Sequence, residues 1–409
     1  MNEREFDVIV WGATGFTGRL VAEHLMQRYG AGGELRWALA GRSERKLEDV
    51  RRGLGERADS VPLVLGDADD PASLERMAAR TTVICSTVGP YALYGSHLVA
   101  ACVAQGTHYC DLTGEVHWMR RMIDLHHQRA RETGARIVHT CGFDSIPSDL
   151  GVAYLQREMQ RRHGTVCRSV KFRVRELRGG MSGGTMSSML NMLEEAQRDP
   201  AVRHLLEDPY ALNPEGERHG LDGPERKVPE YDDDFQAWVT PFIMGAINSK
   251  VVRRSNALGA FPYGRDFRYE EGMVMPFGAW GLPLAAGISA GTAAVSLAAS
   301  ARVVRRNLTR LLPSSGEGPS RRTRESGFYV IDLLGKHPDD WTKNLKVRIQ
   351  GDRDPGYGST SKMLGEAAVC LAKDALDSPG GVLTPATAMA DPLLSRLPLH
   401  AGVTFELLG

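Results

Sequence analysis

Three side chains that can donate a proton lie on loops directly after apolar, strand-like segments. Tyr91 and Tyr94 follow the segment Thr82–Ser86 in the run VGPYALYG, and Asp144 follows the segment Arg136–Thr140 in GFDSIPSD. The carboxyl ends of parallel strands meet at one edge of a sheet, where ligands bind. A tyrosine or a carboxylic acid at that edge can act as a general acid. Aromatic packing in a rigid loop is the alternative for either tyrosine, and we predict that catalysis depends on Tyr91, Tyr94 and Asp144.

A glycine-rich turn near the N-terminus has the composition of a diphosphate-binding loop. Its glycines recur at every third position between an apolar run, Phe6–Trp11, and a helical pattern, Thr14–Arg28. In a dinucleotide-binding fold such glycines permit a tight turn, bring backbone N–H groups close to the pyrophosphate and let the helix pack on the strand. The order is GxxGxxG rather than the commoner GxGxxG. The residues expected to hold the cofactor here are Gly12, Ala13, Thr14, Gly15, Phe16, Thr17 and Gly18.

The end of the second strand-like segment indicates which dinucleotide is bound. An NAD site places Asp or Glu there to accept from the ribose 2′-OH. This chain instead reads ALAGRSERKL, with Arg42, Ser43 and Lys46 after the apolar run. Arginine can grip a 2′-phosphate with two hydrogen bonds and Ser43 can add another, so we predict NADP(H) in preference to a solvated basic loop. Asp67, after the third segment, is expected either to approach the adenine or to close a turn.

The nicotinamide end of the site is expected at two of the loops that carry the proton donors. Gly89 and Pro90 can shape the backbone against the ring after the fourth strand-like segment. Gly142 and Phe143 are expected to border the same pocket after the sixth segment. Ser148 is expected to cap a helix that begins near Asp149.

A regular alternation of strand-like and helical patterns accounts for this arrangement. Helical patterns separate most of the strand-like segments, which is typical of a parallel, doubly wound sheet. The segments are Phe6–Trp11, Leu35–Ala40, Val61–Leu65, Thr82–Ser86, His108–Leu112 and Arg136–Thr140. We therefore predict an α/β protein whose N-terminal part is a Rossmann domain.

The second half of the chain is expected to form an α+β domain. Strand-like runs occur at Lys171–Leu177, Phe328–Leu334 and Asn344–Gln350, the last two joined as antiparallel neighbours. The predicted organisation is an NADP-binding domain at 1–150, a substrate or dimerisation domain at 151–350 and C-terminal helices at 351–409 that pack back on the first domain.

Several motifs together resemble those of a known family. GATGFTG (12–18), AGRS (40–43), STVGPYALYG (86–95), YCDLTGE (109–115) and CGFDSIPSDLG (141–151) resemble the saccharopine dehydrogenase-like oxidoreductases. SGGTMSSML (182–190), GDRDPGYGSTSKMLGEAAVCLA (351–372) and GGVLTPATAM (380–389) resemble its trans-acting enoyl reductase branch. The resemblance implies an NADPH-dependent reductase of a lipid or polyketide acyl chain.

Such a reaction sets requirements on the site. With an α,β-unsaturated acyl group, hydride goes to Cβ, negative charge develops on the carbonyl oxygen, and Cα takes a proton from an acid or ordered water. Two alternatives stay open: an imine reductase of amino-acid metabolism, as in saccharopine chemistry, and a non-catalytic protein that senses NADP(H) or associates with lipid. The loops near the proposed nicotinamide site are poor in arginine, which disfavours a dicarboxylic amino acid as substrate.

An uncharged segment, 277–300, is long enough to span a bilayer and precedes four arginines: Arg302, Arg305, Arg306 and Arg310. It consists mostly of Gly, Ala and Ser, so a buried or dimer-forming helix is the favoured interpretation. Peripheral contact with an anionic membrane is the alternative, with the arginines meeting head groups.

The overall composition narrows the partners. Lys plus Arg (50) balance Asp plus Glu (50), so no global field favours nucleic acid. The six cysteines form no CxxC pair, which fits reduced thiols and no metal site. The N-terminus enters a strand-like run without an apolar signal segment. We expect a cytoplasmic homodimer, with peripheral inner-membrane contact as the alternative, whose partner is an acyl substrate that is free or carrier-bound.

Overall fold

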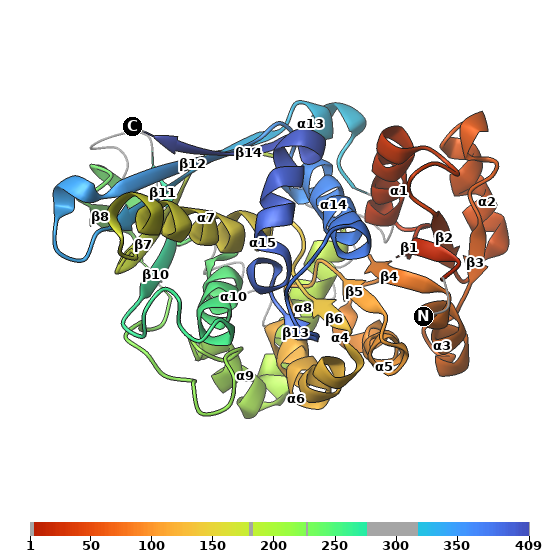
Figure 1. Cartoon of the computed structure of the whole chain (residues 1–409), viewed down its shortest axis with the longest axis horizontal. Coiled ribbons are helices and arrows are strands. Elements are labelled where there is room, and N and C mark those ends of the chain that lie inside the picture. Colours follow the sequence, from red (N-terminus) through yellow and green to blue (C-terminus); the bar gives the residue numbers. More distant parts are fainter. Residues whose placement is uncertain (1–3, 180–182, 226–227, 276–317, 409) are drawn as a thin grey trace.

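The computed structural model describes residues 4–179, 183–225, 228–275 and 318–408. These residues form two seven-stranded sheets, and Figure 1 shows that they lie at opposite ends of the molecule. The apolar segment 277–300 lies outside the described residues. In the described part of the chain, no helix has both the length and the hydropathy needed to cross a membrane.

The first sheet is parallel throughout and has the strand order of a dinucleotide-binding fold. In spatial order its strands are β3 (Leu63–Leu65), β2 (Trp37–Gly41), β1 (Phe6–Trp11), β4 (Thr81–Ser86), β5 (His108–Cys110), β6 (Arg136–Val138) and β13 (Gly381–Leu383). Both ends of each of the six N-terminal strands lie within two residues of the corresponding predicted segment. The predicted Rossmann sheet is therefore confirmed.

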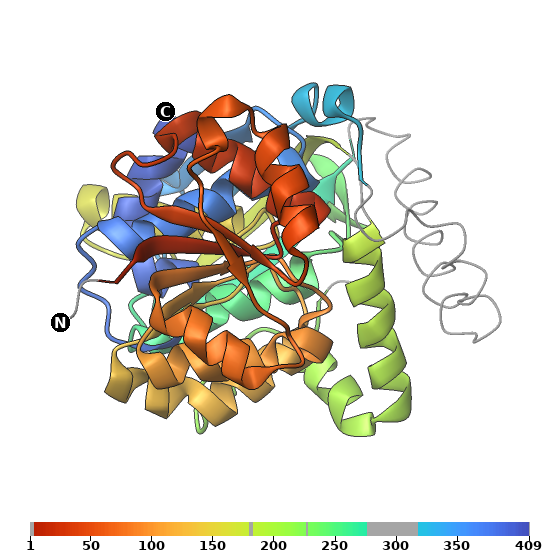
Figure 2. The ribbon, with the colours of Figure 1, turned by 90° about the vertical axis from the view of Figure 1, so that its right-hand side faces the viewer.

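Both faces of this sheet are covered, because successive side chains of a strand point to opposite faces. Val8 and Val10 of β1 belong to one core cluster, and Ile9 and Trp11 belong to the other. Figure 2 shows α1 and α2 on one face and α3 and α5 on the other. The helices of this half are α1 (Phe16–Tyr29), α2 (Glu44–Gly53), α3 (Pro71–Ala79), α4 (Tyr91–Tyr94), α5 (Ser96–Gln105) and α6 (Val116–Thr133), and α7 (Ile146–His163) follows them in the chain.

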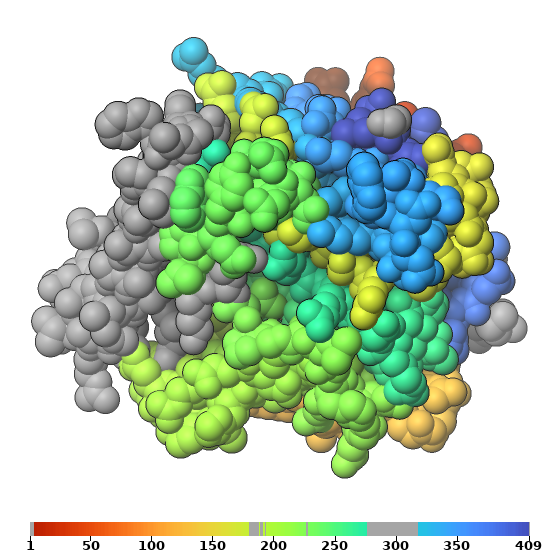
Figure 3. Space-filling view, turned by 90° about the vertical axis from the view of Figure 1, so that its left-hand side faces the viewer, coloured from red at the N-terminus to blue at the C-terminus, as the bar shows by residue number. Residues whose placement is uncertain are grey.

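The second sheet is mixed, with β7 and β10 parallel and its other neighbours antiparallel. In spatial order its strands are β14 (Val403–Leu408), β12 (Leu345–Gly351), β11 (Phe328–Lys336), β7 (Ser169–Arg178), β10 (Arg268–Val274), β9 (Ala237–Thr240) and β8 (Glu230–Asp232). Helices α7 and α10 (Gly245–Leu258) pack on it. Figure 3 shows the β8–β9 region in green and the β11–β12 connection in blue at this end of the molecule. The second domain is α+β, as predicted.

The C-terminal segment connects the two sheets. Helix α14 (Thr360–Lys373) packs against α1 and against β1 and β4, while β13 extends the first sheet and β14 the second. The remaining helices are α8 (Gly183–Arg198), α9 (Pro200–Glu207), α13 (Arg321–Glu325) and α15 (Pro385–Arg396).

A buried carboxylate joins α1 to the C-terminal helices. Glu366 is fully buried and accepts hydrogen bonds from His24 (2.8 Å), Tyr29 (2.8 Å) and Arg396 (3.2 Å). Burial alone would raise the pKa of Glu366, but the hydrogen bond and charge of His24 and the Tyr29 bond outweigh it, so the pKa is lowered.

Glu366→Gln is expected to lower the free energy of unfolding at pH 7 by about 2–3 kcal/mol, because bonds to a charged group become bonds to a neutral one. A lowered folded-state pKa stabilises the protein above the ordinary value of about 4.5, and this advantage is lost as pH falls through the folded pKa. Urea unfolding at pH 7 and pH 4 should therefore show the difference shrinking at the lower pH. An equal difference at both values would contradict this assignment.

Candidate functional site

The glycine turn joins β1 to α1 in a conformation that needs glycine at two positions. Gly12 has φ +84°, and a Cβ there would lie 2.6 Å from Val88 Cγ2. A Cβ at Gly18 would overlap the carbonyl oxygen of Gly12, so only glycine lets the helix pack this close to the turn. Among the described residues, a Cβ at Gly15 meets only the Gly12 oxygen, at 3.2 Å. The space over Gly15 is therefore open to a ligand.

The first turn of α1 offers hydrogen-bond donors to that space. Gly15 is the N-cap residue and supplies no side-chain cap. Arg19 is the first residue whose backbone N–H reaches the Gly15 carbonyl oxygen, at 3.1 Å. Within the described chain, the N–H groups of Phe16, Thr17 and Gly18 have no acceptor. Free N–H groups at the positive end of a helix dipole fit a diphosphate.

The end of β2 lies beside this turn, because a Cβ at Gly41 would lie 3.8 Å from Thr14 Cγ2. Arg42 and Lys46, which follow Gly41, are exposed and free to turn toward a bound phosphate. Ser43 caps α2 by accepting from the Lys46 N–H at 3.4 Å, and its hydroxyl proton stays available. These donors fit a 2′-phosphate.

Asp67 follows β3 and closes its own turn, since its carboxylate accepts from the Asp69 N–H at 3.1 Å. The structure thus shows the turn-forming role that the sequence left open for this residue. Its approach to an adenine remains a prediction.

The loop after β4 is fixed by hydrogen bonds to a buried carboxylate. Gly89 and Pro90 are joined by a cis peptide bond, and α4 begins immediately after them. The buried carboxylate of Glu115 accepts from the N–H groups of Tyr91 (2.8 Å) and Ala92 (2.9 Å) and from the Ser188 hydroxyl (2.9 Å). Glu115 therefore ties this loop to α8, a segment distant in the sequence.

The two candidate tyrosines lie in different environments. Tyr91 is 3% exposed, donates its hydroxyl to the Ser86 carbonyl oxygen at 3.2 Å, and stacks on Trp118 at 5.6 Å between ring centroids. Burial and the charge of Asp111 raise its pKa well above the ordinary value. Tyr94 is 42% exposed. This placement favours a packing role for Tyr91, and catalysis by either tyrosine remains a prediction.

Asp144 occupies the turn between β6 and α7. Among the described residues, no group forms a hydrogen bond or ion pair with its carboxyl. Burial raises its pKa to about 7. A carboxylic acid that is half protonated near neutral pH and has no fixed partner is suited to donate a proton to a substrate.

The turn that carries Asp144 is fixed by the second half of the chain. The Phe143 N–H donates to Thr360 Oγ1 at 2.9 Å, and its ring meets that of Tyr329 edge-to-face at 4.8 Å. A Cβ at Gly142 would lie 2.9 Å from Thr360 Cγ2. The expected helix start near Asp149 is wrong, because α7 begins at Ile146 and Ser148 lies buried inside it.

Comparisons with known proteins agree with this geometry. Residues 8–138 match the family described as the saccharopine dehydrogenase NADP binding domain. A putative trans-acting enoyl reductase of Mycobacterium tuberculosis is 44% identical over 416 residues, covering 98% of this chain and 97% of that protein. The chain belongs to the trans-acting enoyl reductase family. A trans-acting enoyl reductase of Mycobacterium bovis is 41% identical with the same coverage.

The fold of this trans-acting enoyl reductase family member is shared with a solved enzyme. Apo saccharopine dehydrogenase (L-Glu forming) from Saccharomyces cerevisiae superposes with a TM-score of 0.53 at 13% identity, covering 98% of this chain and 99% of that one. At this identity the likeness shows the fold alone. The matched domain makes the chain an NADP-dependent oxidoreductase, so the predicted cofactor NADP(H) is confirmed.

Arg42→Ala is expected to reduce the preference for NADPH over NADH by about tenfold, roughly 1.4 kcal/mol, because the 2′-phosphate loses its bidentate partner. Calorimetric titration with both cofactors measures the preference. Arg52→Ala is the matched control. Arg52 lies near the C-terminal end of α2, the helix that begins just after Arg42, and pairs there with Asp49. An unchanged preference in Arg42→Ala would remove Arg42 from the site.

Sequence reasoning missed a buried pair behind the site. His139 donates through Nδ1 to Asp111 at 2.8 Å, and Asp111 also accepts from the N–H groups of Thr113 (3.1 Å) and Thr140 (3.2 Å). Thr140 has φ +63°, which is strained for a β-branched residue. The carboxylate of Asp111 therefore holds the strained start of the turn that leads to Asp144. Asp111 directly follows β5 and His139 directly follows β6, and this position after a parallel strand was the sequence signal that could have identified the pair.

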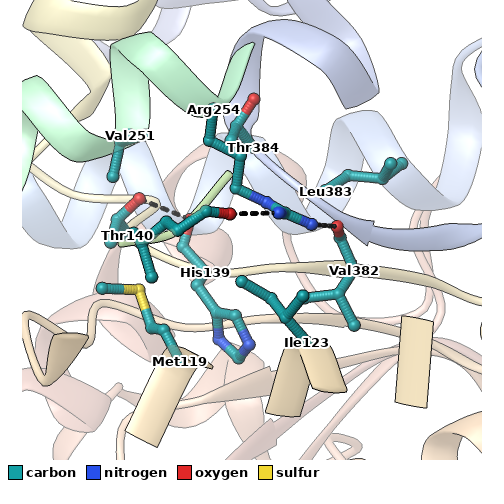
Figure 4. A pocket seen from close by; sticks show the side chains of 10 residues that line it. Met119, Ile123, His139, Thr140, Val251, Arg254, Val382, Leu383 and Thr384 are labelled. Atoms are coloured by element: carbon teal, nitrogen blue, oxygen red, sulfur yellow. Dashed lines mark hydrogen bonds between the residues drawn. The ribbon is translucent and has the colours of Figure 1, made fainter. Parts of the chain in front are cut away.

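A small cavity lies behind this strained turn (Figure 4). His139 and Thr140 line it together with apolar side chains of α6, and Arg254 of α10 donates to the Val382 carbonyl oxygen at 2.6 Å across it. The cavity lies between the turn that leads to Asp144 and the β13 segment, and its largely apolar lining fits a structural role better than a substrate site.

Proposed function

We propose that this protein reduces an α,β-unsaturated acyl group with NADPH and that Asp144 protonates Cα. The observation that carries the proposal is the carboxyl of Asp144, which has a pKa of about 7 and no partner in the described chain. The names of relatives at 41–44% identity support the acyl substrate and the enoyl reduction.

The roles of the residues follow from their positions. The N–H groups of Phe16, Thr17 and Gly18 would hold the pyrophosphate, and Arg42, Ser43 and Lys46 the 2′-phosphate. When bound, the reduced nicotinamide supplies a hydride to Cβ of the substrate. Gly89 and Pro90, anchored by Glu115, and Gly142 and Phe143, anchored by Thr360, would form the walls that orient the reacting carbons.

Asp144 completes the reduction. Negative charge that develops on the acyl carbonyl is delocalised onto Cα, and the Asp144 carboxyl gives its proton to that carbon. The carboxylate that remains regains a proton from solvent, because Asp144 is partly exposed. Each turnover therefore consumes one hydride and one proton.

The decisive experiment compares enoyl thioesters with imines in NADPH oxidation by the same preparation. We expect turnover with the thioesters and none above background with imines formed from amino acids. Faster oxidation with imines would overturn the proposal in favour of amino-acid chemistry. Tight NADPH binding without oxidation by any substrate would favour a sensor.

The proposal also covers the acyl carrier, the oligomeric state and the membrane contact. We infer that the acyl chain is presented on a carrier and that the protein works as a cytoplasmic homodimer. Peripheral contact with an anionic membrane would depend on the uncharged segment 277–300 and the arginines after it. Light scattering tests the dimer, and sedimentation with anionic vesicles at low and high salt tests the membrane contact.

A further inference from the structure

The aromatic ring of Phe16 connects the glycine turn to a distant part of the chain. Phe16 is the first residue of α1 and directly follows Gly15. Its ring meets that of Tyr357 edge-to-face, with 5.1 Å between the ring centroids. A Cβ at Gly318 would lie 2.4 Å from Phe16 Cε1, so the backbone at Gly318 lies against the same ring. Two segments from the second half of the chain therefore contact the turn where the pyrophosphate is proposed to bind.

A cation from this part of the chain lies over the Phe16 ring. The guanidinium carbon of Arg324 is 5.3 Å from the ring centroid, a distance typical of a cation–π contact. Arg324 belongs to α13, and its Nη1 donates to the Pro319 carbonyl oxygen at 2.8 Å. Its own carbonyl oxygen accepts from the Asp354 N–H at 3.0 Å. These contacts hold the guanidinium beside the first turn of α1.

Part of this guanidinium has no partner in the described chain. Nη1 donates to Pro319, whereas Nε and Nη2 have no hydrogen-bond acceptor among the residues that the structure describes. The charge of the buried Asp354 acts with that of Arg324. Its carboxylate, however, accepts from the N–H groups of Tyr357 (3.1 Å) and Gly358 (2.8 Å). Arginine presents its donors as a planar fork that matches phosphate oxygens, so a free edge of this fork is available to an anion.

We propose that Arg324 is a cofactor-binding residue: the free edge of its guanidinium, held beside Phe16, binds a diphosphate oxygen of NADP(H). The inference rests on the proposed place of the pyrophosphate at the N–H groups of Phe16, Thr17 and Gly18. The ring and the N–H of Phe16 belong to one residue, so the guanidinium over the ring and the anion at the N–H are neighbours. Their attraction is strengthened where water is partly excluded, and Arg324 is half-buried. The cofactor is thereby held by both halves of the chain.

Arg324→Met tests this assignment with two ligands. Adenosine 2′-monophosphate carries the 2′-phosphate of the cofactor but lacks its diphosphate, whereas NADPH carries both. Calorimetric titration of the variant should give a dissociation constant for NADPH about tenfold above that of wild type, because the diphosphate loses a charge-assisted partner. The dissociation constant for adenosine 2′-monophosphate should stay within about twofold. Arg42→Ala should weaken the binding of both ligands, because Arg42 is the proposed partner of the phosphate that they share.

Arg321→Met is the matched control. Arg321 lies on the same short helix, is 81% exposed and pairs with Glu325 at 2.8 Å. The substitution removes the same charge from the same helix, and the affinities for both ligands should equal those of wild type. Arg324→Lys keeps the positive charge but loses the planar fork, so its NADPH affinity should fall by only about threefold. Thermal unfolding of each variant checks that the packing on Phe16 survives.

Two results would overturn the role of Arg324. One is an NADPH affinity of Arg324→Met within about twofold of wild type, and the other is an equal loss of affinity for both ligands, which would indicate a general disturbance of the domain. Gly15→Val distinguishes this inference from the proposed place of the pyrophosphate. Weaker NADPH binding in Gly15→Val with unchanged binding in Arg324→Met would overturn the role of Arg324 alone. Unchanged binding in both variants would also remove the pyrophosphate from the glycine turn.

Discussion

Asp144→Asn is expected to lower kcat for enoyl reduction by about 10²–10⁴-fold, with NADPH affinity unchanged within about twofold. An acid must carry its proton to donate it, so wild-type kcat should fall as pH rises through about 7. The residual activity of the variant should lack this fall. Stopped-flow single turnovers across pH 6–9 would separate this step from substrate binding and product release.

The same substitution should stabilise the fold at alkaline pH. Burial raises the pKa of Asp144 from its ordinary value of about 3.8 to about 7, so stability falls as pH rises between these two values and levels off above the upper one. At pH 8 the Asp144→Asn variant should unfold at a higher temperature than wild type. Lower turnover combined with higher stability is the signature of a group kept for function rather than for folding.

Asp149→Asn provides the matched control. Burial raises the pKa of Asp149 to about 7 as well, but its carboxylate accepts from the Ala386 N–H at 2.8 Å and supports the start of α15. We expect this variant to lose stability and to keep the wild-type pH profile of kcat. A wild-type profile in Asp144→Asn itself would assign the proton donor elsewhere, with Tyr94 the next candidate.

Gly15→Val is expected to raise the dissociation constant for NADPH by about 100-fold, roughly 2.8 kcal/mol. The backbone at Gly15 has φ −75° and ψ 168°, which a valine adopts readily, and among the described residues its Cβ meets one atom, the Gly12 oxygen at 3.2 Å. The added side chain would instead fill the space in front of the free N–H groups of α1. Fluorescence titration with NADPH and thermal unfolding together test this separation of binding from stability.

Substitutions at two other glycines serve as controls for Gly15→Val. Gly18→Ala should destabilise the domain itself, because its Cβ overlaps the Gly12 carbonyl oxygen. Gly53→Ala should change neither stability nor binding markedly, since no other part of the described chain lies within 4 Å of its Cβ position. Unchanged NADPH affinity in Gly15→Val would mean that the pyrophosphate does not lie over this turn.

Local patterns were sufficient to predict six of the seven strands of the first sheet. Each of these six N-terminal strands is a short apolar run bounded by turn residues, and β1 coincides with the predicted segment Phe6–Trp11. The seventh strand, β13, comes from the C-terminal part of the chain and was not predicted. The second sheet was harder to predict, and its strands β8 and β9 have only three and four residues, too few to establish a period.

The site residues also differ in how far the local sequence predicts their surroundings. The positive φ at Gly12 and the close packing of Gly18 against the Gly12 carbonyl oxygen are local properties of a strand-to-helix turn. The glycine-rich sequence of this turn is therefore sufficient to predict them. Tyr91 is buried partly by stacking on Trp118, which belongs to α6. Its hydroxyl therefore could not be distinguished from that of Tyr94 by sequence spacing.

The sequence by itself determined the parallel α/β domain, the position of the glycine-rich turn between β1 and α1 and the choice of NADP(H), because these depend on residues close together in the chain. Only the tertiary structure decided that Glu115 anchors the Gly89–Pro90 loop, that Thr360 fixes the Asp144 turn, and that no other described residue forms a hydrogen bond or ion pair with the Asp144 carboxyl. Burial and hydrogen bonding are set by residues distant in sequence that folding brings together, and the pKa of a carboxyl follows from those surroundings.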